Sequence, residues 1–489
     1  MRHTWLASAN RWKGSDVSDR WDAIVVGAGP NGLTAAATMA RAGRSVLVLE
    51  AGPAIGGGTR TDEAFGAGIR RDICSAVHPT GYSSPAFDDL GVAERIDWLV
   101  PEVSVAHAYS ADDGLALYRD PHRLADELGR DARSWERMVA LGADLAADVL
   151  ELPGMPKHPL ALMRFGPTAL APIEAFVRVA FRDERTRTAF AAIAAHAGRP
   201  TTALGSTAPG LLLGMLTEAG WPVAAGGSQA IADALAAIVV EGGGSIETSH
   251  TVRDFAELPP ADQVFFDVSP RALTGILGDR LPSRYRRALE RYEYGGGVCK
   301  VDFLLREPIP WTGPTADALG ATATFHIAAD RAQIRETEAA VAHGRLPDRP
   351  WILGGEPTRI DRSRAPDGAH LAWAYCHVPA GSDVDVSGRI VAEIDRCAPG
   401  FRDVIVDRIV TTAAGFEAHN PNYIGGDINC GAATLRQLLA RPVPSLRPHA
   451  TPLPGVYLCS SATAPGGGVH GMCGYRAARA ALNEGVVSR

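Results

Sequence analysis

The stretch Asp22-Ala-Ile-Val-Val-Gly-Ala-Gly-Pro-Asn-Gly-Leu-Thr34, followed by Val46-Leu-Val-Leu-Glu50, decides the fold of this chain. It reads as a buried apolar strand, a glycine turn, a helix of small residues and a second strand that ends on an acid. Gly27 permits the tight turn, Gly29 lets a pyrophosphate approach the backbone, and Gly32 lets the helix pack closely on its strand. The stretch therefore predicts a dinucleotide-binding βαβ unit.

The parts of this unit each have a place in nucleotide binding. The start of the helix, which is expected over about residues 33–42, points unpaired N–H groups at the phosphates. Glu50, with Ala51 directly after it, is placed to accept hydrogen bonds from an adenosine ribose. A triple-glycine pattern alone is weak, and a βαβ turn that binds nothing is the alternative. The order of strand, helix, strand and acid favours the binding site.

The composition is that of a globular protein. The chain has 489 residues, of which 46% are hydrophobic, and a formal net charge of −7. This length exceeds one simple core, so two intertwined domains are expected. The net charge gives no electrostatic reason to expect nucleic acid as a partner.

The seven cysteines are scattered without a CxxC pair. Neither a disulfide framework nor a dithiol redox centre is expected, and the pattern suits a reducing cytoplasm. No group of Cys and His has zinc-site spacing, so we expect no metal. The first 20 residues lack the apolar core of a secretory signal and are expected to be a flexible extension. No segment reads as a membrane-spanning helix.

Two further glycine-rich stretches are suited to a flat cofactor. In Ile55-Gly-Gly-Gly-Thr-Arg-Thr61 the glycines would let the backbone curl against the cofactor, and Arg60 could reach a phosphate or an isoalloxazine edge. Residues 458–482 read as a strand, a glycine loop and the start of a helix. Such a helix start can hold the negative charge that collects on a reduced flavin.

With these motifs the chain resembles the phytoene desaturase (carotene desaturase-like) flavoproteins. Besides the N-terminal glycines, the likeness rests on Gly56-Gly-Gly58, Pro222-Val-Ala-Ala-Gly-Gly-Ser-Gln229 and Pro465-Gly-Gly-Gly-Val-His-Gly-Met-Cys-Gly474. Within that group it is most similar to the branch named pyridine nucleotide-disulfide oxidoreductase domain-containing protein 2, which Asn420-Pro-Asn-Tyr-Ile-Gly-Gly-Asp-Ile428 also resembles. The resemblance covers roughly residues 20–485 and implies FAD as the cofactor.

The resemblance also implies which residues bind FAD. They are Gly27, Gly29, Pro30, Asn31, Gly32, Glu50, Ala51, Gly57, Gly58, Arg60, Thr61, Val252, Ser461, Gly467, Gly468, Val469, His470, Gly471 and Met472. Val252 would give a backbone contact on the adenine side, and residues 467–472 would contact the ring. Where many members have a Gly-Asp pair for the ribitol, this chain has Ser460-Ser461, so a serine hydroxyl or a backbone amide would have to make that contact.

The predicted fold is α/β: a Rossmann-like FAD-binding domain of the glutathione reductase/amine oxidase-like kind, with an inserted mixed α+β substrate domain. After the extension of residues 1–20, the FAD-binding domain is assigned to residues 21–105, 225–295 and 425–489. The substrate domain is assigned to residues 106–224 and 296–424.

Four residues are candidates for chemistry or substrate binding. His470 precedes the helix that should abut the flavin ring and could relay a proton, with a structural role at the helix start as the alternative. Lys300 could position a water, as in amine oxidases of this fold, or be salt-bridged. Asn422 and Tyr423 lie near the expected domain junction, where ligands commonly bind, although turn formation explains their segment equally well.

The sequence therefore predicts a FAD-dependent oxidoreductase that dehydrogenates an apolar small organic substrate, with an isoprenoid or polyene as one option. Hydride would pass to the flavin N5. A flavin amine oxidase and a non-redox binding or escort protein on the same scaffold are the alternatives. Oxygen and quinone both stay open as electron acceptors, as does the oligomeric state. The expected location is cytoplasmic. Residues 170–190 and 211–216 could line a substrate tunnel or dock peripherally on a membrane, with core packing as the alternative.

Overall fold

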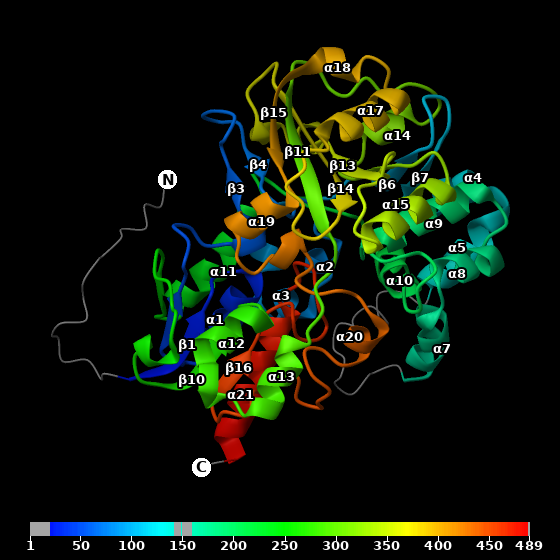
Figure 1. Cartoon of the computed structure of the whole chain (residues 1–489). Coiled ribbons are helices and arrows are strands. Elements are labelled where there is room, and N and C mark those ends of the chain that lie inside the picture. Colours follow the sequence, from blue (N-terminus) through cyan, green and yellow to red (C-terminus); the bar gives the residue numbers. More distant parts are fainter. Residues whose placement is uncertain (1–19, 141–147, 149–158, 488–489) are drawn as a thin grey trace.

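The computed structural model describes residues 20–140, 148 and 159–487. A five-stranded parallel sheet organises one half of the molecule (Figure 1). Its order is β16-β10-β1-β2-β9, from β1 (Trp21–Val26), β2 (Val46–Leu49), β9 (Ser245–Glu247), β10 (Ala261–Phe266) and β16 (Val456–Leu458). All four pairings are parallel, so the carboxyl ends of the strands meet at one edge of the sheet.

Helices cover both faces of this sheet, which explains why its central strands are apolar throughout. On one face lie α1 (Pro30–Arg41), α11 (Gln229–Glu241) and α21 (Met472–Val487), and their small and aliphatic residues form one core with β1 and β2. On the other face, α12 (Pro270–Leu277) and α13 (Ser283–Glu290) pack in a second core.

A seven-stranded mixed sheet organises the other half. Its order is β15-β11-β14-β13-β12-β6-β7, and only the β12–β6 pairing is parallel. The strands are β6 (Val103–Ala108), β7 (Gly114–Tyr118), β11 (Gly297–Leu305), β12 (Phe325–Ile327), β13 (Ile352–Gly355), β14 (His370–Val378) and β15 (Ile405–Thr411).

Most of the remaining helices surround this second sheet. They are α4 (Pro121–Leu128), α5 (Ala132–Val139), α7 (Pro159–Leu170), α8 (Ile173–Ala180), α9 (Glu184–Ala195), α10 (Thr207–Met215), α14 (Ala316–Gly320), α15 (Arg331–Ala342), α16 (Pro357–Ile360), α17 (Ser387–Cys397), α18 (Phe401–Val404) and α19 (Ala413–His419). The helices of residues 121–215 gather beyond the β6–β7 edge (Figure 1). No helix in the described part of the chain is long and apolar enough to cross a bilayer.

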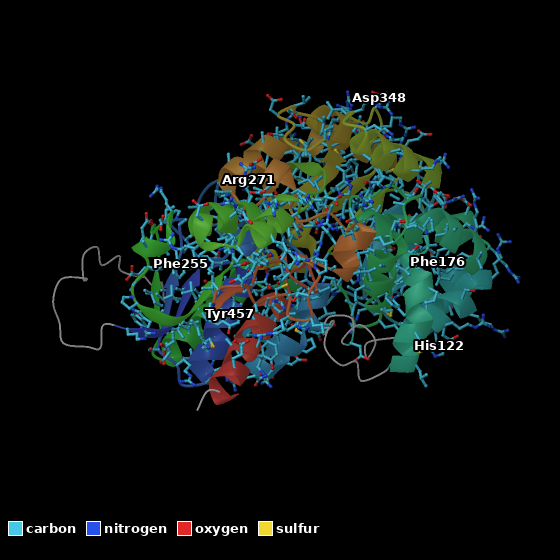
Figure 2. The ribbon with its side chains drawn as sticks, turned by 60° about the horizontal axis from the view of Figure 1, so that its bottom comes forward. His122, Phe176, Phe255, Arg271, Asp348 and Tyr457 are labelled. Atoms are coloured by element: carbon cyan, nitrogen blue, oxygen red, sulfur yellow. The ribbon has the colours of Figure 1, made fainter. Side chains whose placement is uncertain are left out.

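Short elements lie between the two sheets and in their connections. They are α2 (Pro79–Tyr82), α3 (Pro85–Leu90), α20 (Leu435–Leu439), β3 (Thr61–Asp62), β4 (Arg71–Asp72), β5 (Trp98–Leu99), β8 (Val223–Ala224), and the 3₁₀ turns η1 (Gly57–Thr59), η2 (Ala93–Arg95), η3 (Gly129–Asp131), η4 (Phe255–Glu257), η5 (Gly278–Arg280), η6 (Arg362–Arg364) and η7 (Ile424–Gly426). In Figure 2, Phe255 and Tyr457 mark the half with the parallel sheet, and Phe176 and His122 mark the opposite end.

The predicted α/β fold class is confirmed, while two element boundaries differ from the expectation. The helix after the glycine turn, expected from Leu33, begins at Pro30, since proline at the first helical position presets the backbone. The sequence also predicts a strand over residues 245–252, but this strand ends at Glu247 because the chain turns at Ser249, whose φ is +57°. The expected extension of residues 1–20 lies outside the described residues, apart from residue 20. So do residues 141–147 and 149–158 of the stretch 120–196, for which the sequence predicts mostly helix. The domain boundaries remain a prediction.

Candidate functional site

The site begins at the glycine turn between β1 and α1. Gly27, with φ +102°, donates its N–H to the carbonyl of Leu49 at 2.8 Å and so joins the ends of β1 and β2. A Cβ on Gly32 would overlap the carbonyl oxygen of Gly27, so only glycine lets α1 start this close to the turn. No side chain caps α1 at Gly29. The helix therefore begins as an anion-binding N-terminus.

The second glycine stretch lies directly against the first. Gly57 has φ +51°, and a Cβ there would come within 3.1 Å of the Cα of Gly29. A Cβ on Gly58 would overlap the hydroxyl of Tyr423. The C-terminal loop closes the group, because a Cβ on Gly471 would overlap the hydroxyl of Thr34 on α1. We call residues 27–32, 56–58 and 467–472 together the dinucleotide cradle.

Glu50 lies at the carboxyl end of β2, at the edge of the cradle. Its Oε2 accepts the N–H of Ala28 and its Oε1 accepts the N–H of Gly52, both at 2.7 Å. Arg60 approaches the same loop and places Nη2 2.7 Å from Nε2 of His419. The carboxylate predicted to bind the ribose thus stands beside the glycine turn, with the exposed Ala51 next to it.

The adenine-side prediction falls close to Glu50. After β9, the N–H of His250 binds the carbonyl of Glu50 at 2.8 Å, and the N–H of Ser249 binds that of Gly52 at 2.7 Å. Val252 follows and packs in the core beneath β1 and β2. The structure therefore brings the backbone around residues 249–252 to the loop that carries the predicted ribose acceptor.

Ser461 connects the C-terminal segment to the start of α1. Its hydroxyl accepts a hydrogen bond from Nδ2 of Asn31 at 3.2 Å, and its carbonyl accepts one from Nη1 of Arg441 at 3.3 Å. The Oδ1 of Asn31 is buried without a hydrogen-bond partner among the described residues. Ser461, a predicted cofactor-binding residue, thus lies next to the predicted phosphate site.

His470 is buried within the C-terminal loop. Its Nδ1 accepts the N–H of Met472 at 3.1 Å, and its carbonyl accepts the hydroxyl of Ser84 at 2.6 Å. Burial lowers the pKa of His470 to about 4, so the ring is neutral at pH 7. Its Nε2 is buried without a hydrogen-bond partner in the described part of the chain. The ring also interacts with the backbone of Gly466 and Gly467, so its surroundings are those of a structural residue at a helix start.

Lys300 lies in a buried ionic network rather than beside a free water site. Its Nζ donates to the carbonyl of Asp72 at 2.8 Å and to the carboxylate of Asp302. The other oxygen of Asp302 accepts Nη1 of Arg71 at 2.7 Å. Lys300 is therefore salt-bridged.

Thr61 belongs to the same region. Its hydroxyl donates to Oδ1 of Asp72 at 2.7 Å and accepts the N–H of Gln229 at 3.1 Å. Asp72 also binds Nη1 of Arg364 at 2.8 Å. The side chain of Thr61 thus joins the segment after the cradle to α11, and only its backbone is left for the predicted cofactor contact.

The two predicted substrate residues have different surroundings. The Oδ1 of Asn422 accepts the N–H of Ser269 at 2.8 Å and so fastens this segment to the start of α12. Tyr423 packs with Val298 and Phe416, and Tyr375 lies at the edge of the same cluster. Because Tyr423 also meets Gly58, it stands where the seven-stranded sheet approaches the cradle.

The sequence reasoning missed Asp267, which directly follows β10. Its Oδ2 accepts the N–H of Gly32 at 2.9 Å. Burial raises the pKa of Asp267 to about 7, against the lowering effect of the amides of Gly32 and Gly29. The available signal was its position, since an acid after a third parallel strand reaches the same sheet edge as the glycine turn.

The sequence reasoning also missed a buried histidine–carboxylate pair on the second sheet. Nδ1 of His377, on β14, lies 2.6 Å from Oε1 of Glu338, on α15. Trp351 donates its indole N–H to the same oxygen at 2.7 Å. Burial acts to lower the pKa of His377, but the carboxylate of Glu338 outweighs it and holds that pKa above its ordinary value. No short-range pattern links these positions, because the topology alone brings them together.

Three more histidines continue this cluster. Nε2 of His196 lies 2.8 Å from Nε2 of His326, whose ring centroid is 4.8 Å from that of His107. Burial lowers the pKa of His196 and of His107 to about 3, so both rings are neutral. The carbonyl of His196 accepts Nδ2 of Asn429 at 3.5 Å, and a Cβ on Gly467 would come within 3.0 Å of the carbonyl oxygen of Asn429. The cluster thus extends towards the cradle.

The fold and the cradle define a dinucleotide-binding protein of the Rossmann type. In agreement, the family model described as NAD(P)-binding Rossmann-like domain matches residues 25–90. The chain is 24% identical to pyridine nucleotide-disulfide oxidoreductase domain-containing protein 2 of Mus musculus, over 98% of this chain and 96% of that protein. This likeness agrees with the resemblance seen in the sequence, while the relation to phytoene desaturases stays a prediction.

Solved structures share the whole architecture. An oxidoreductase from Methanosarcina mazei superposes with a TM-score of 0.64 at 16% identity, over 94% of this chain and 99% of that chain. Cyclohexylamine oxidase from Brevibacterium oxydans superposes with a TM-score of 0.60 at 15% identity, over 96% of this chain and 100% of that chain. At these identities the likeness establishes the fold.

Proposed function

We propose that this protein is a FAD-dependent oxidoreductase that dehydrogenates an apolar small organic molecule. The observation that carries the proposal is the convergence of three glycine-rich loops on the start of α1, directly beside Tyr423 at the end of the second sheet. The residues present fit FAD, because the glycine-lined start of α1 can present backbone N–H groups to its pyrophosphate and Glu50 can present a carboxylate to its ribose. When bound, FAD supplies the hydride acceptor.

The chain offers a candidate partner for each part of FAD. The start of α1 would hold the pyrophosphate, Glu50 would bind the ribose, and residues 467–472 would contact the isoalloxazine ring. Ser461 would stand in for the ribitol-binding acid, because its hydroxyl already reaches Asn31.

A group able to accept a proton supports dehydrogenation between neighbouring carbons. Loss of hydride from one carbon requires loss of a proton from the next, and a histidine paired with a carboxylate can take that proton. His377 lies behind Tyr375, with ring centroids 6.0 Å apart, and Tyr375 belongs to the cluster around Tyr423. The pair Glu338–His377 is therefore our candidate proton acceptor, and the aromatic rings of Trp351 and Tyr375 beside it favour an apolar substrate.

Amine oxidation is the second candidate, because structures of that activity share the fold. Its lysine-held water finds no support at Lys300, whose ammonium is held by Asp72 and Asp302. A non-redox binding protein is the third candidate. The intact phosphate-binding glycines and the complete C-terminal glycine motif argue against it.

The first experiment is the visible absorption spectrum of the purified full-length protein before and after denaturation. A two-banded flavin spectrum whose chromophore is released into the soluble fraction on denaturation supports non-covalent FAD. The protein is then mixed anaerobically with cyclohexylamine and, separately, with a monoterpene hydrocarbon. Bleaching by the hydrocarbon supports the proposal, and bleaching by the amine alone replaces it with amine oxidation. A colourless protein that FAD does not reconstitute overturns both the proposed dehydrogenation and amine oxidation. If the flavin is bleached, admission of oxygen or of a quinone to the reduced protein then identifies the electron acceptor.

A further inference from the structure

Asp267 places a carboxyl group in contact with the glycine turn of the cradle. Its Oδ2 takes the N–H of Gly32 at 2.9 Å, and the same oxygen lies 2.7 Å from where a Cβ on Gly29 would stand. A Cβ on Gly32 would come within 2.9 Å of the Cβ of Asp267. The glycines at these positions therefore make room for an acid as well as for a ligand.

The surroundings of this carboxyl disfavour a negative charge. Among residues 20–140, 148 and 159–487, no Lys or Arg forms an ion pair with Asp267. The titratable groups that interact with it are Glu50 at the end of β2 and the thiols of Cys430 and Cys459. Burial, together with the charge of Glu50, raises the pKa of Asp267 to about 7, while the cradle amides act to lower it.

An ionised Asp267 and a pyrophosphate compete for the same backbone N–H groups at the start of α1. Both are anions, and both are attracted to the N–H groups at the start of α1. Asp267 is only partly buried, so a ligand that fills the cradle removes water from it. Its ionised form then loses solvation and meets two further negative charges. Its protonated form meets neither cost and can donate a hydrogen bond to a phosphate oxygen.

We propose that Asp267 is a cofactor-binding residue that acts in its protonated form, so that binding of the pyrophosphate of FAD is coupled to the uptake of one proton by this carboxyl. The inference rests on the proposed function for the identity of the ligand. It adds a residue outside the glycine motifs to the cofactor site, and it makes the affinity for FAD depend on pH.

The sign of that dependence follows from linkage. Below about pH 7 the carboxyl of the free protein is already protonated, and the dissociation constant for FAD is flat. Above pH 7 the proton must be taken up on binding, so the dissociation constant rises by up to about tenfold for each pH unit. A ligand without the pyrophosphate, such as adenosine, does not share this slope.

The test is a titration of the FAD-free full-length protein with FAD, and separately with adenosine, at pH 6, 7, 8 and 9. The variants are Asp267→Asn, which keeps the shape and loses the charge, and the matched control Asp262→Asn. Asp262 lies on β10, which Asp267 directly follows, and its side chain is 55% exposed in an ion pair with Arg20. Calorimetry of FAD binding in two buffers of different ionisation enthalpy counts the protons taken up by the unaltered protein.

We expect the dissociation constant for FAD to rise about tenfold per pH unit between pH 7 and 9 in the unaltered protein and in Asp262→Asn, and to stay flat in Asp267→Asn. We expect uptake of about one proton at pH 8. An unchanged slope in Asp267→Asn, or no proton uptake by the unaltered protein, overturns the inference; the second readout needs no variant to fold. Absence of FAD binding at every pH refutes the proposed function instead.

Discussion

The hydroxyl of Tyr423 rests against the backbone of Gly58, so that any side chain at position 58 would overlap it. This contact joins the return of the chain from the second sheet to the second glycine loop of the cradle. The two residues therefore set the distance between the cofactor loop and the substrate side of the site.

The first prediction concerns this contact. In Gly58→Ala the new methyl group displaces Tyr423, and we expect the protein to retain less FAD after dialysis while its far-UV circular dichroism is unchanged. In Gly58→Ala combined with Tyr423→Phe the overlapping hydroxyl is gone, and retention recovers in part. Equal loss of FAD in the single and double variants would show that the contact does not govern the cradle.

The second prediction concerns Glu50. Its carboxylate holds two backbone amides, and the proposed ribose adds a third partner. Loss of hydrogen bonds to a charged group costs about 1.5–3 kcal/mol, so we expect Glu50→Ala to weaken FAD binding roughly ten- to a hundredfold. Titration with FAD measures it. Glu50→Gln keeps one acceptor oxygen, so we expect its affinity for FAD to lie between those of the unaltered protein and Glu50→Ala. Equal affinity of Glu50→Ala and the unaltered protein would refute the placement of Glu50.

The third prediction separates two roles of His470. Because Nδ1 of His470 caps the N–H of Met472, we expect His470→Ala to lose about 1 kcal/mol of stability and about 1 °C in Tm, with FAD retained. His470→Asn can supply an acceptor oxygen and regains that stability. If the imidazole also serves the reaction, both variants turn over more slowly. Full turnover in His470→Asn would leave this residue with a structural role only.

The fourth prediction concerns the pair of Glu338 and His377. The imidazole of His377 can accept a proton only in its neutral form, so we expect the rate of flavin reduction to rise as pH rises through the pKa of His377. Glu338 favours the charged ring and raises that pKa, so Glu338→Gln lowers it. We expect the acid limb of the rate profile to move to lower pH, measured by anaerobic stopped-flow with the substrate that bleaches the flavin. A limb that stays in place excludes His377 as the acceptor.

Much of the cofactor half could be read from the sequence, because its signals are local. Gly27, Gly29 and Gly32 follow a buried strand, and Glu50 ends the next one, so turn chemistry and strand length predict their meeting. The parallel sheet, and the closeness of the C-terminal loop to α1, follow from the same logic. These contacts depend on glycines at fixed spacing, which few other folds require.

The contacts in the half with the seven-stranded sheet were harder to predict from the sequence, for a physical reason. His377 and Glu338 meet because β14 and α15 pack together, and no spacing in the chain encodes that contact. The partners of Lys300 were likewise open until the fold placed Asp72 beside it. Asp267 is intermediate between the contacts that local sequence predicts and those that only the fold creates. Its position after β10 could have been predicted from the sequence, but its contact with Gly32 depends on the direction of its side chain.

The order of strands in the parallel sheet has a consequence for how the protein is made. β16 comes from residues 456–458 and pairs with β10, which lies next to β1. A ribosome has therefore released residue 458 before this sheet can be completed. The half with the parallel sheet is not an autonomous unit that could be cut out, transplanted or expressed from the codons of β1 and β2 alone. A nascent chain must keep β1 and β2 competent for assembly, with the entire second sheet folding in between.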